Sequence, residues 1–319
     1  MHRLHSLFVR ALLAALAGTF AGSAAAEEIA VGNYGVSANG MPFGVALAKG
    51  YFKEEGLDIT GLISSAGGGT SLRNMLAGGG VPYGEVNPGV VVSAILAGAD
   101  LKIVSDNVLT VAEFVWAVKP DSAIKSIKDL KGKKIGYTNP RSTSQALARM
   151  LLQIAGYQPD DAELVKTGGF GEGIAALDSG LVDVVPITEP LWSKLKSKYR
   201  AVVVASDVLP PLDNVVGVAT LEMMEKRGDF IRAVIRARRK AVQFMKEHPD
   251  EAGDIVAKQY NLEPEVARAA VRTLTTSSAM TPAARSFTIQ IPPSATNASH
   301  KTAAESREQS SDTKKSEHP

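Results

Sequence analysis

Residues 63–72 read ISSAGGGTSL and place three consecutive glycines directly before an expected helix start. A P-loop needs a lysine followed by serine or threonine after its last glycine, whereas here Thr70 and Ser71 follow Gly69 at once. A dinucleotide-binding loop needs glycines at i, i+2 and i+5, and counting from the first glycine the third position is Leu72. The stretch therefore does not predict a nucleotide site, and its use must be argued from the rest of the chain.

The first 26 residues have the layout of a secretory signal peptide. Arg3 and Arg10 precede the apolar run ALLAALAGTFA, and the small residues Ser23–Ala26 stand before Glu27. A basic start, a short apolar core and an Ala-x-Ala exit predict export and cleavage. Because adjacent twin arginines are absent, general secretion is expected. The alternative is an uncleaved anchor, although the run is short for crossing a bilayer.

The composition indicates a free, soluble protein stabilised by burial. The chain has no cysteine among its 319 residues, so neither disulfides nor a thioether-linked lipid anchor is expected. Its apolar residues suffice for two cores. We therefore expect a monomer in a Gram-negative periplasm.

Charge and histidine content argue against two other classes. Loss of the two signal arginines takes the basic residues from 35 to 33, which equals the 33 acidic residues. A near-neutral chain offers no electrostatic footprint for nucleic acid. His248, His300 and His318 are isolated from one another and lack metal-ligand spacing. No metal, cofactor or catalytic residue is expected.

Short β-branched or apolar runs alternate with amphipathic helical segments, which predicts an α/β fold. Strands are expected over 29–32, 57–63, 101–105, 114–118, 163–166, 182–186, 202–205 and 215–219, and helices over 39–51, 70–77, 143–155, 171–179 and 229–248, with a further helix between Pro88 and Leu96 that Gly98 stops. Further turns are expected at 78–80 and before the strand of DLKGKKIGY. The last two strands are expected to return toward the first unit.

A strand, a loop of small residues and a helix recur along the chain. The loops are NYGVSANG (33–40), SSAGGGTS (64–71) and TNPRSTS (138–144), followed by the similar TGGFGEG (167–173) and TEP (188–190). Loops at the carboxyl ends of parallel strands line the ligand crevice, and the helices that follow direct unpaired N–H groups at it. The pattern favours a small polar or anionic ligand between two halves. The alternative is that each loop is a simple tight turn.

The last third of the chain holds a strong helix and then a change of composition. In the helix expected over 229–248, Arg232, Arg236, Arg239 and Lys240 lie apart from the apolar stripe, as either a partner-docking face or a solvated one. From about Ser277 the chain is rich in Ser, Thr, Pro and charge, which predicts disorder.

Five segments occur in an order that resembles a known family. They are GYFKEEGLDI (50–59), LAGGGVPYGEV (76–86), DLKGKKIGY (129–137) with its Ser/Thr loop, LDSGLVDVVPITEP (177–190) and EHPDEA (247–252). In this order they resemble ABC-transporter periplasmic solute-binding proteins, in the branch that binds sulfonates, taurine, nitrate or thiamine-precursor pyrimidines. The resemblance covers roughly residues 29–276.

The resemblance implies a type II periplasmic binding fold, in which two α/β lobes joined by two crossing strands close on a ligand. The implied division is a signal peptide at 1–26, a first lobe at 27–112 that is completed by 212–278, a second lobe at 113–211, and a disordered, atypical tail at 279–319. Two departures stand out. GVPYGEV replaces the G-x-x-D-x-G pattern of relatives, and the chain breaks into its polar tail near Ser277, as if truncated or read out of frame, where relatives continue with helices.

Position in the family pattern implies a set of ligand contacts: Asn33, Tyr34, Gly68, Gly69, Thr70, Asn87, Trp116, Thr138, Arg141, Ser142, Thr143, Gly169, Phe170 and Glu189. Arg141 is expected either to pair with a sulfonate or carboxylate or to be a surface arginine. Trp116 is expected as a stacking wall for the ligand or as core or hinge packing. Glu85 and Glu189 are expected to neutralise a ligand amine or to be solvated carboxylates.

Three functions fit these observations. The first is a solute-binding component that captures a small polar or anionic molecule and delivers it to an inner-membrane ABC permease. The second is a periplasmic receptor that presents the bound solute to a membrane sensor, which uses the same closure. The third is an enzyme similar to the fungal pyrimidine synthases, whose cysteine-rich motif and reactive histidine have no counterpart in the expected loops.

Overall fold

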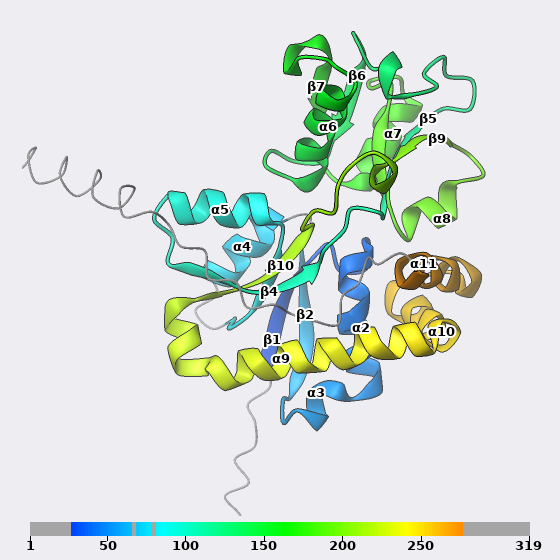
Figure 1. Ribbon diagram of the computed structural model, residues 1–319. Coiled ribbons are helices and arrows are strands. Elements are labelled where there is room, and N and C mark those ends of the chain that lie inside the picture. The colour runs from blue at the N-terminus through cyan, green and yellow to red at the C-terminus, as the bar shows by residue number, and fades with distance from the viewer. Residues whose placement is uncertain (1–26, 66–67, 78–80, 277–319) are drawn as a thin grey trace, which may run out of the picture.

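The computed structural model describes residues 27–65, 68–77 and 81–276, which form two α/β lobes (Figure 1). The signal peptide expected at 1–26, the first of the three glycines, the turn expected at 78–80 and the tail expected from 277 onward lie outside the described residues. The large lobe contains the first and last described segments, and the small lobe lies above it in the figure.

The large lobe is built on one five-stranded sheet. Its strands are β1 (Glu27–Gly32), β2 (Ile59–Ser65), β3 (Gly84–Val86), β4 (Leu101–Val108) and β10 (Val215–Thr220). Their order is β2-β1-β3-β10-β4, with β1 parallel to β2 and β3, and with β10 antiparallel to β3 and β4. The chain therefore leaves this sheet after β4 and returns to its interior in β10.

Helices cover both faces of this sheet. They are α2 (Met41–Lys49), α3 (Tyr51–Glu54), α4 (Gly68–Ala77), α5 (Pro88–Leu96), α9 (Leu221–Glu247), α10 (Pro249–Tyr260) and α11 (Pro264–Thr276), with the 3₁₀ turn η1 (Ala38–Gly40). Ile29 and Val31 pack with residues of α2, α9, α10 and α11, whereas Ala30 between them packs with residues of α4 and α5. This alternation follows from the two-residue period of a strand.

The small lobe has its own sheets and cores. Its strands are β5 (Phe114–Val118), β6 (Lys134–Tyr137), β7 (Glu163–Lys166), β8 (Val185–Thr188) and β9 (Arg200–Val204), and its helices are α6 (Thr143–Ile154), α7 (Phe170–Asp178) and α8 (Leu191–Leu195) with η2 (Ile127–Asp129), η3 (Pro159–Asp161) and η4 (Ala205–Asp207). An antiparallel sheet of order β8-β5-β9 lies beside the parallel pair β6-β7. An isolated bridge between Ile135 and Val184 joins them.

Most elements begin and end within a few residues of the positions that the sequence pattern predicts. One expectation was wrong: the strand expected over 202–205 is β9, and it pairs with β5 inside the small lobe instead of returning to the first sheet. The strand expected over 215–219 does return, as β10. The segment 249–276, for which the pattern gave no element, forms α10 and α11. The exact lobe boundaries at 112 and 211 stay predictions.

A buried ion pair joins α9 to the centre of the large sheet. Arg238 on α9 and Glu85 on β3 have side-chain exposures of 5% and 0%, and Arg238 Nε lies 3.4 Å from Glu85 Oε1. Asn107 completes the arrangement, because its Nδ2 donates to Glu85 Oε1 at 2.8 Å and its carbonyl oxygen accepts from Arg238 Nη2 at 2.9 Å. Burial raises the pKa of Glu85, and the Arg238 charge opposes that rise.

Two arginines of α9 provide a matched test of this pair. Arg238→Gln leaves the buried Glu85 without its cation, and removal of one partner of a buried pair costs about 3 to 5 kcal/mol. Arg236→Gln removes a surface pair in which Arg236 is 52% and Glu55 12% exposed. Because Glu55 keeps Lys240 as a partner, this change should cost at most about 1 kcal/mol. Urea unfolding followed by circular dichroism measures both values. Equal losses for the two variants would contradict the structural role assigned to Arg238.

Candidate functional site

A cavity of about 380 Å³ lies between the two lobes. Its lining comes from the carboxyl ends of strands and from the segments that follow them in both lobes. The lining residues are Gly32, Asn33, Ser37, Asn39, Gly69, Thr70, Arg73, Glu85, Val86, Asn87, Val90, Glu113, Phe114, Thr138, Asn139, Pro140, Ser142, Thr143, Ser144, Lys166, Phe170, Thr188, Asn214 and Val215.

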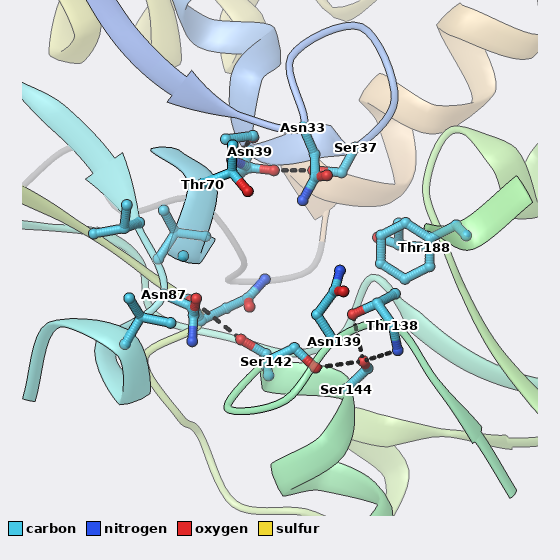
Figure 2. Close-up of a pocket in the computed structure, with 18 of the residues that line it drawn as sticks. Asn33, Ser37, Asn39, Thr70, Asn87, Thr138, Asn139, Ser142, Ser144 and Thr188 are labelled. Atoms are coloured by element: carbon cyan, nitrogen blue, oxygen red, sulfur yellow. Dashed lines mark hydrogen bonds between the residues drawn. The ribbon is translucent and has the colours of Figure 1, made fainter. Parts of the chain in front are cut away.

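The segment after β1 forms the upper wall in Figure 2, where Asn33, Ser37, Asn39 and Thr70 are labelled. Asn33 adopts a left-handed conformation (φ 55°), which asparagine tolerates better than most residues. Asn39 is held in place by donating its Nδ2 to the carbonyl oxygen of Gly32 at 3.0 Å and to Glu85 Oε2 at 3.3 Å. Ser37 Oγ donates to Asn39 Oδ1, so the polar side chains of this wall are fixed by one another.

Four helices begin at the cavity. Its lining includes Thr70 in the first turn of α4, the N-cap Asn87 of α5, the N-cap Ser142 of α6 and the first residue of α7, Phe170. Ser142 Oγ accepts from the backbone N–H of Gln145 at 3.2 Å. Helix N-termini carry unpaired N–H groups and a partial positive charge. The convergence of four such ends from two lobes favours a negatively charged or strongly polar group in the cavity.

The small lobe contributes the wall on which Thr138, Asn139, Ser142 and Ser144 are labelled in Figure 2, and this wall contacts the large lobe at Asn87. Ser144 Oγ accepts from the backbone N–H of Thr138 at 3.0 Å and lies 2.9 Å from Ser142 Oγ. Across the lobes, Asn87 Nδ2 donates to the carbonyl oxygen of Arg141 at 2.8 Å. The two walls are therefore in direct contact beside the cavity.

Two side chains at the cavity supply positive charge from opposite lobes. Arg73 lies on the first turns of α4 in the large lobe, and its Nη2 donates to Thr70 Oγ1 at 2.9 Å. Lys166 ends β7 in the small lobe. Both side chains are exposed. They are suited to clamp an oxyanion from two sides.

Buried carboxyl groups also lie at or close to the cavity. Glu113 is 3% exposed and accepts from Asn214 Nδ2 through Oε1. Its pKa is raised to about 8, first by burial and then by the charges of Glu189 and Glu85. Burial also raises the pKa of Glu189, whose Oε2 accepts from the backbone N–H of Ser193 at 3.1 Å.

Apolar side chains complete the lining. Phe114 and Phe170 meet edge to face with ring centroids 6.1 Å apart, and Val86, Val90 and Val215 also line the cavity. Such surfaces bury a carbon skeleton, while the polar groups fix its orientation. The cavity is therefore suited to a small amphiphilic molecule.

Many of the ligand contacts that the sequence implies lie together here. Those in the lining are Asn33, Gly69, Thr70, Asn87, Thr138, Ser142, Thr143 and Phe170. Glu85, expected as a partner for a ligand amine, is also in the lining but is already paired with Arg238.

Other expected contacts lie elsewhere. The Tyr34 hydroxyl donates to Gln259 of α10 at 2.9 Å, and Trp116 is fully buried in the core of the small lobe beside Phe114. Arg141 is exposed and has a left-handed backbone (φ 65°). None of these three is in the cavity lining, and the same holds for Gly169, which is the N-cap of α7, and for Glu189. Gly68 begins α4.

The lining also holds residues that sequence reasoning missed, and they differ in how easily they could be found. Arg73 follows Thr70 by three residues on an expected helix, so it was available from helical spacing. Lys166 stands directly before a loop that was already identified. Glu113 and Asn214 precede strands in irregular segments, and no local pattern marks them.

Comparison with known proteins assigns the chain to a family. The profile of the family described as NMT1/THI5 like matches residues 37–252, which is more than half of the chain, and the chain belongs to this family. A Bacillus subtilis (strain 168) protein that carries the name of an aliphatic sulfonates-binding protein is 25% identical over 249 residues, covering 73% of this chain and 70% of its own length. A formylaminopyrimidine-binding protein of Halalkalibacterium halodurans is 26% identical over 227 residues, covering 66% of this chain and 64% of its own length.

Solved structures show the same fold. The periplasmic aliphatic sulphonate binding protein SsuA of Escherichia coli has a TM-score of 0.68 at 20% identity, covering 90% of this chain and 88% of that chain. The alkanesulfonate-binding protein SsuA of Xanthomonas axonopodis pv. citri, bound to MOPS, has a TM-score of 0.70 at 18% identity, covering 88% and 94%. The expected periplasmic binding protein fold is therefore confirmed. At these sequence identities the likeness shows the fold and not the ligand.

Within the ranges 27–65, 68–77 and 81–276, no helix combines the length and the apolar character that spanning a bilayer requires. The same ranges hold no group of three or more histidine, aspartate or glutamate side chains arranged to hold a metal ion.

The raised pKa of Glu113 predicts how stability depends on pH. Because the carboxyl binds its proton more tightly in the folded protein (about 8) than at its ordinary value of 4.5, its contribution is complete below pH 4.5 and is lost as the pH rises through 8. The loss is about 1.4 kcal/mol per pH unit within this interval.

Glu113→Gln keeps an acceptor for Asn214 but cannot ionise. Thermal unfolding of the ligand-free protein at pH 5, 6, 7 and 8 should show a falling transition temperature for the unmodified protein and a flatter profile for the variant. Parallel profiles for the two proteins would show that Glu113 ionises in the folded state as it does in water.

Proposed function

We propose that this protein is the extracytoplasmic solute-binding component of an ABC importer, which captures a small polar or anionic organic solute and delivers it to a membrane permease. The observation that carries the proposal is the cavity between the lobes, into which four helix N-termini and two cationic side chains from both lobes converge. The names of an aliphatic sulfonates-binding and a formylaminopyrimidine-binding relative support sulfonates and pyrimidine-like molecules as candidate solutes. The resemblance of the sequence adds taurine and nitrate as candidates. Export through the signal peptide expected at 1–26 would bring the protein to the periplasm.

Contacts across the cavity support a closing motion around the solute. The Asn87–Arg141 hydrogen bond joins the start of α5 to the loop before α6. Thr143 Oγ1 of α6 also donates to the carbonyl oxygen of Asn214, directly before β10, at 3.5 Å. Hinged closure around a ligand is the established motion of periplasmic binding proteins. A solute that bridges the two walls stabilises the closed arrangement.

Binding without conversion agrees with the side chains present. The one histidine of the described ranges, His248, lies against Phe244 with ring centroids 5.0 Å apart and is outside the cavity lining. The chain has no cysteine. The cavity lining thus offers charge, hydrogen bonds and apolar contact but no histidine or thiol for general-base or nucleophilic chemistry.

A ligand panel tests the proposal. The mature chain is screened by thermal shift against ethanesulfonate, taurine, nitrate, benzoate, 4-aminopyrimidine and 4-methylpyrimidine, and each hit is measured by isothermal titration calorimetry. The proposal predicts one-to-one binding of at least one solute, which mass spectrometry recovers unchanged. Conversion of the solute, or no binding anywhere in the panel, would contradict it.

The cations at the cavity give a prediction about anionic solutes. Arg73→Gln and Lys166→Gln should each weaken binding of an anionic hit roughly tenfold, because each removes one charge-assisted hydrogen-bond donor from the anion. Arg141→Gln should change the affinity less than twofold, since the Arg141 side chain is exposed and outside the lining. If calorimetry shows a larger loss of affinity for Arg141→Gln than for the other two variants, the anion binds at Arg141 and this assignment is wrong.

A further inference from the structure

Among the described residues that line the cavity, two buried side-chain atoms have no hydrogen-bond partner. They are Glu113 Oε2, in the segment before β5, and Thr188 Oγ1, at the end of β8. Both residues line the cavity, and their side chains are almost completely buried, at 3% and 0% exposure. An unpaired buried polar atom costs about 1 to 3 kcal/mol. This cost is recovered when a bound molecule supplies the missing partner.

The donor next to Glu113 within the protein is already used. Asn214 donates its Nδ2 to the other oxygen of Glu113, Oε1. Thr188 pairs with Phe114, the residue after Glu113, in the antiparallel β5-β8 ladder, so the two unpartnered side chains come from adjacent strand ends. One small group in the cavity is therefore suited to meet both atoms.

The charged groups that act on Glu113 are carboxylates, and none of them is a cation. Glu85 on β3 already has Arg238 of α9 as its partner, and Arg238 is the one buried cation in the described part of the chain. The other ionisable groups that face Glu113 are Glu189, after β8, and Tyr260 of α10, and neither brings positive charge. In its carboxylate form Glu113 lacks a hydrogen-bond donor at Oε2, and a positively charged donor fits best because it also favours that form.

We propose that the solute carries a nitrogen with N–H groups, and that Glu113 and Thr188 bind this nitrogen while the helix N-termini hold the rest of the molecule. The inference rests on the proposed function and narrows its solute class. The nitrogen belongs either to the ammonium group of an amino acid or aminosulfonate, or to the amino group of a heteroaromatic ring. Both groups donate N–H hydrogen bonds, but the ammonium group carries a positive charge and the heteroaromatic amino group does not.

Paired ligands that differ by one amino group test this inference. Taurine is compared with ethanesulfonate, and 4-aminopyrimidine with 4-methylpyrimidine, by calorimetry on the mature chain. In at least one pair the amino member should bind at least tenfold more tightly. Glu113→Gln should abolish that preference, because it presents an NH₂ group where the carboxylate accepted, and Thr188→Val should reduce it severalfold.

Controls separate recognition from folding. Glu163→Gln makes the same chemical change at an exposed position of β7 and should retain the full preference. Far-ultraviolet circular dichroism checks that each variant is folded. The amine-free member of the pair should bind Glu113→Gln and the unmodified protein equally well, which a misfolded variant would not do.

Proton release identifies the source of the nitrogen. Burial among Glu85 and Glu189 keeps the Glu113 pKa at about 8 in the ligand-free protein, so at pH 7 the carboxyl is mostly protonated. An ammonium ligand requires the carboxylate, so binding should release close to one proton, seen as different apparent enthalpies in phosphate and Tris buffers and absent in Glu113→Gln. A neutral aminopyrimidine instead takes the Glu113 proton onto its ring nitrogen, which leaves the carboxylate to accept from the amino group, so its binding should release no proton to the buffer.

The outcomes distinguish this inference from the proposed function. If an amine-free solute binds as tightly as its amino twin, or if Glu113→Gln keeps the preference, the inference is wrong and the solute-binding function stands. If no member of the panel binds the unmodified protein, both are overturned.

Discussion

The architecture depends on one geometric constraint: the strand ends of two separate sheets must open toward the same space. In the large lobe, the chain leaves β1, β2 and β3 at this edge and enters η1, α4 and α5, and in the small lobe it leaves β6 and β7 here and enters α6 and α7. Because each following helix begins at the cavity, the backbone itself supplies N–H groups and positive dipole ends. Side chains then decide which molecule fits. This division explains why the fold accommodates different solutes with little change of framework.

The interior of the large lobe connects this edge of the sheet to the helix behind it. Strand β10 enters between β3 and β4 after the chain has built the small lobe, and the buried Arg238–Glu85 pair fastens β3 to α9. Gly217 of β10 allows the close packing of this strand, since a Cβ there would clash with the hydroxyl oxygens of Ser105 and Tyr83. Glu85 thereby connects the cavity wall to the helix on which the lobe is built, and its neighbour Asn39 orients the first loop.

Local patterns predicted much of the fold because they reflect local physics. The small-residue loops and the helix starts around Thr70 and Thr143 follow from turn and capping preferences, and both residues line the same cavity. The position of the Arg141 side chain was harder to predict, because it depends on the left-handed backbone conformation of Arg141 itself. Glu113 could not be found from sequence at all, since its significance comes from burial and from partners about a hundred positions away, such as Asn214. The prediction that β9 returns to the first sheet was wrong for the same reason, because strand pairing depends on contacts that are distant in the sequence.

The central claim is that one solute is held by helix N-termini of both lobes at once. Hydrogen–deuterium exchange of the mature chain, with and without a solute found by the panel, measures this claim most directly. The account predicts slowed exchange at the amides that open α4 and α5 in the large lobe and α6 and α7 in the small lobe, with the far ends of these helices unchanged. Protection confined to one lobe, or centred on the α3–α9 surface around Tyr51 and Phe244, would contradict it.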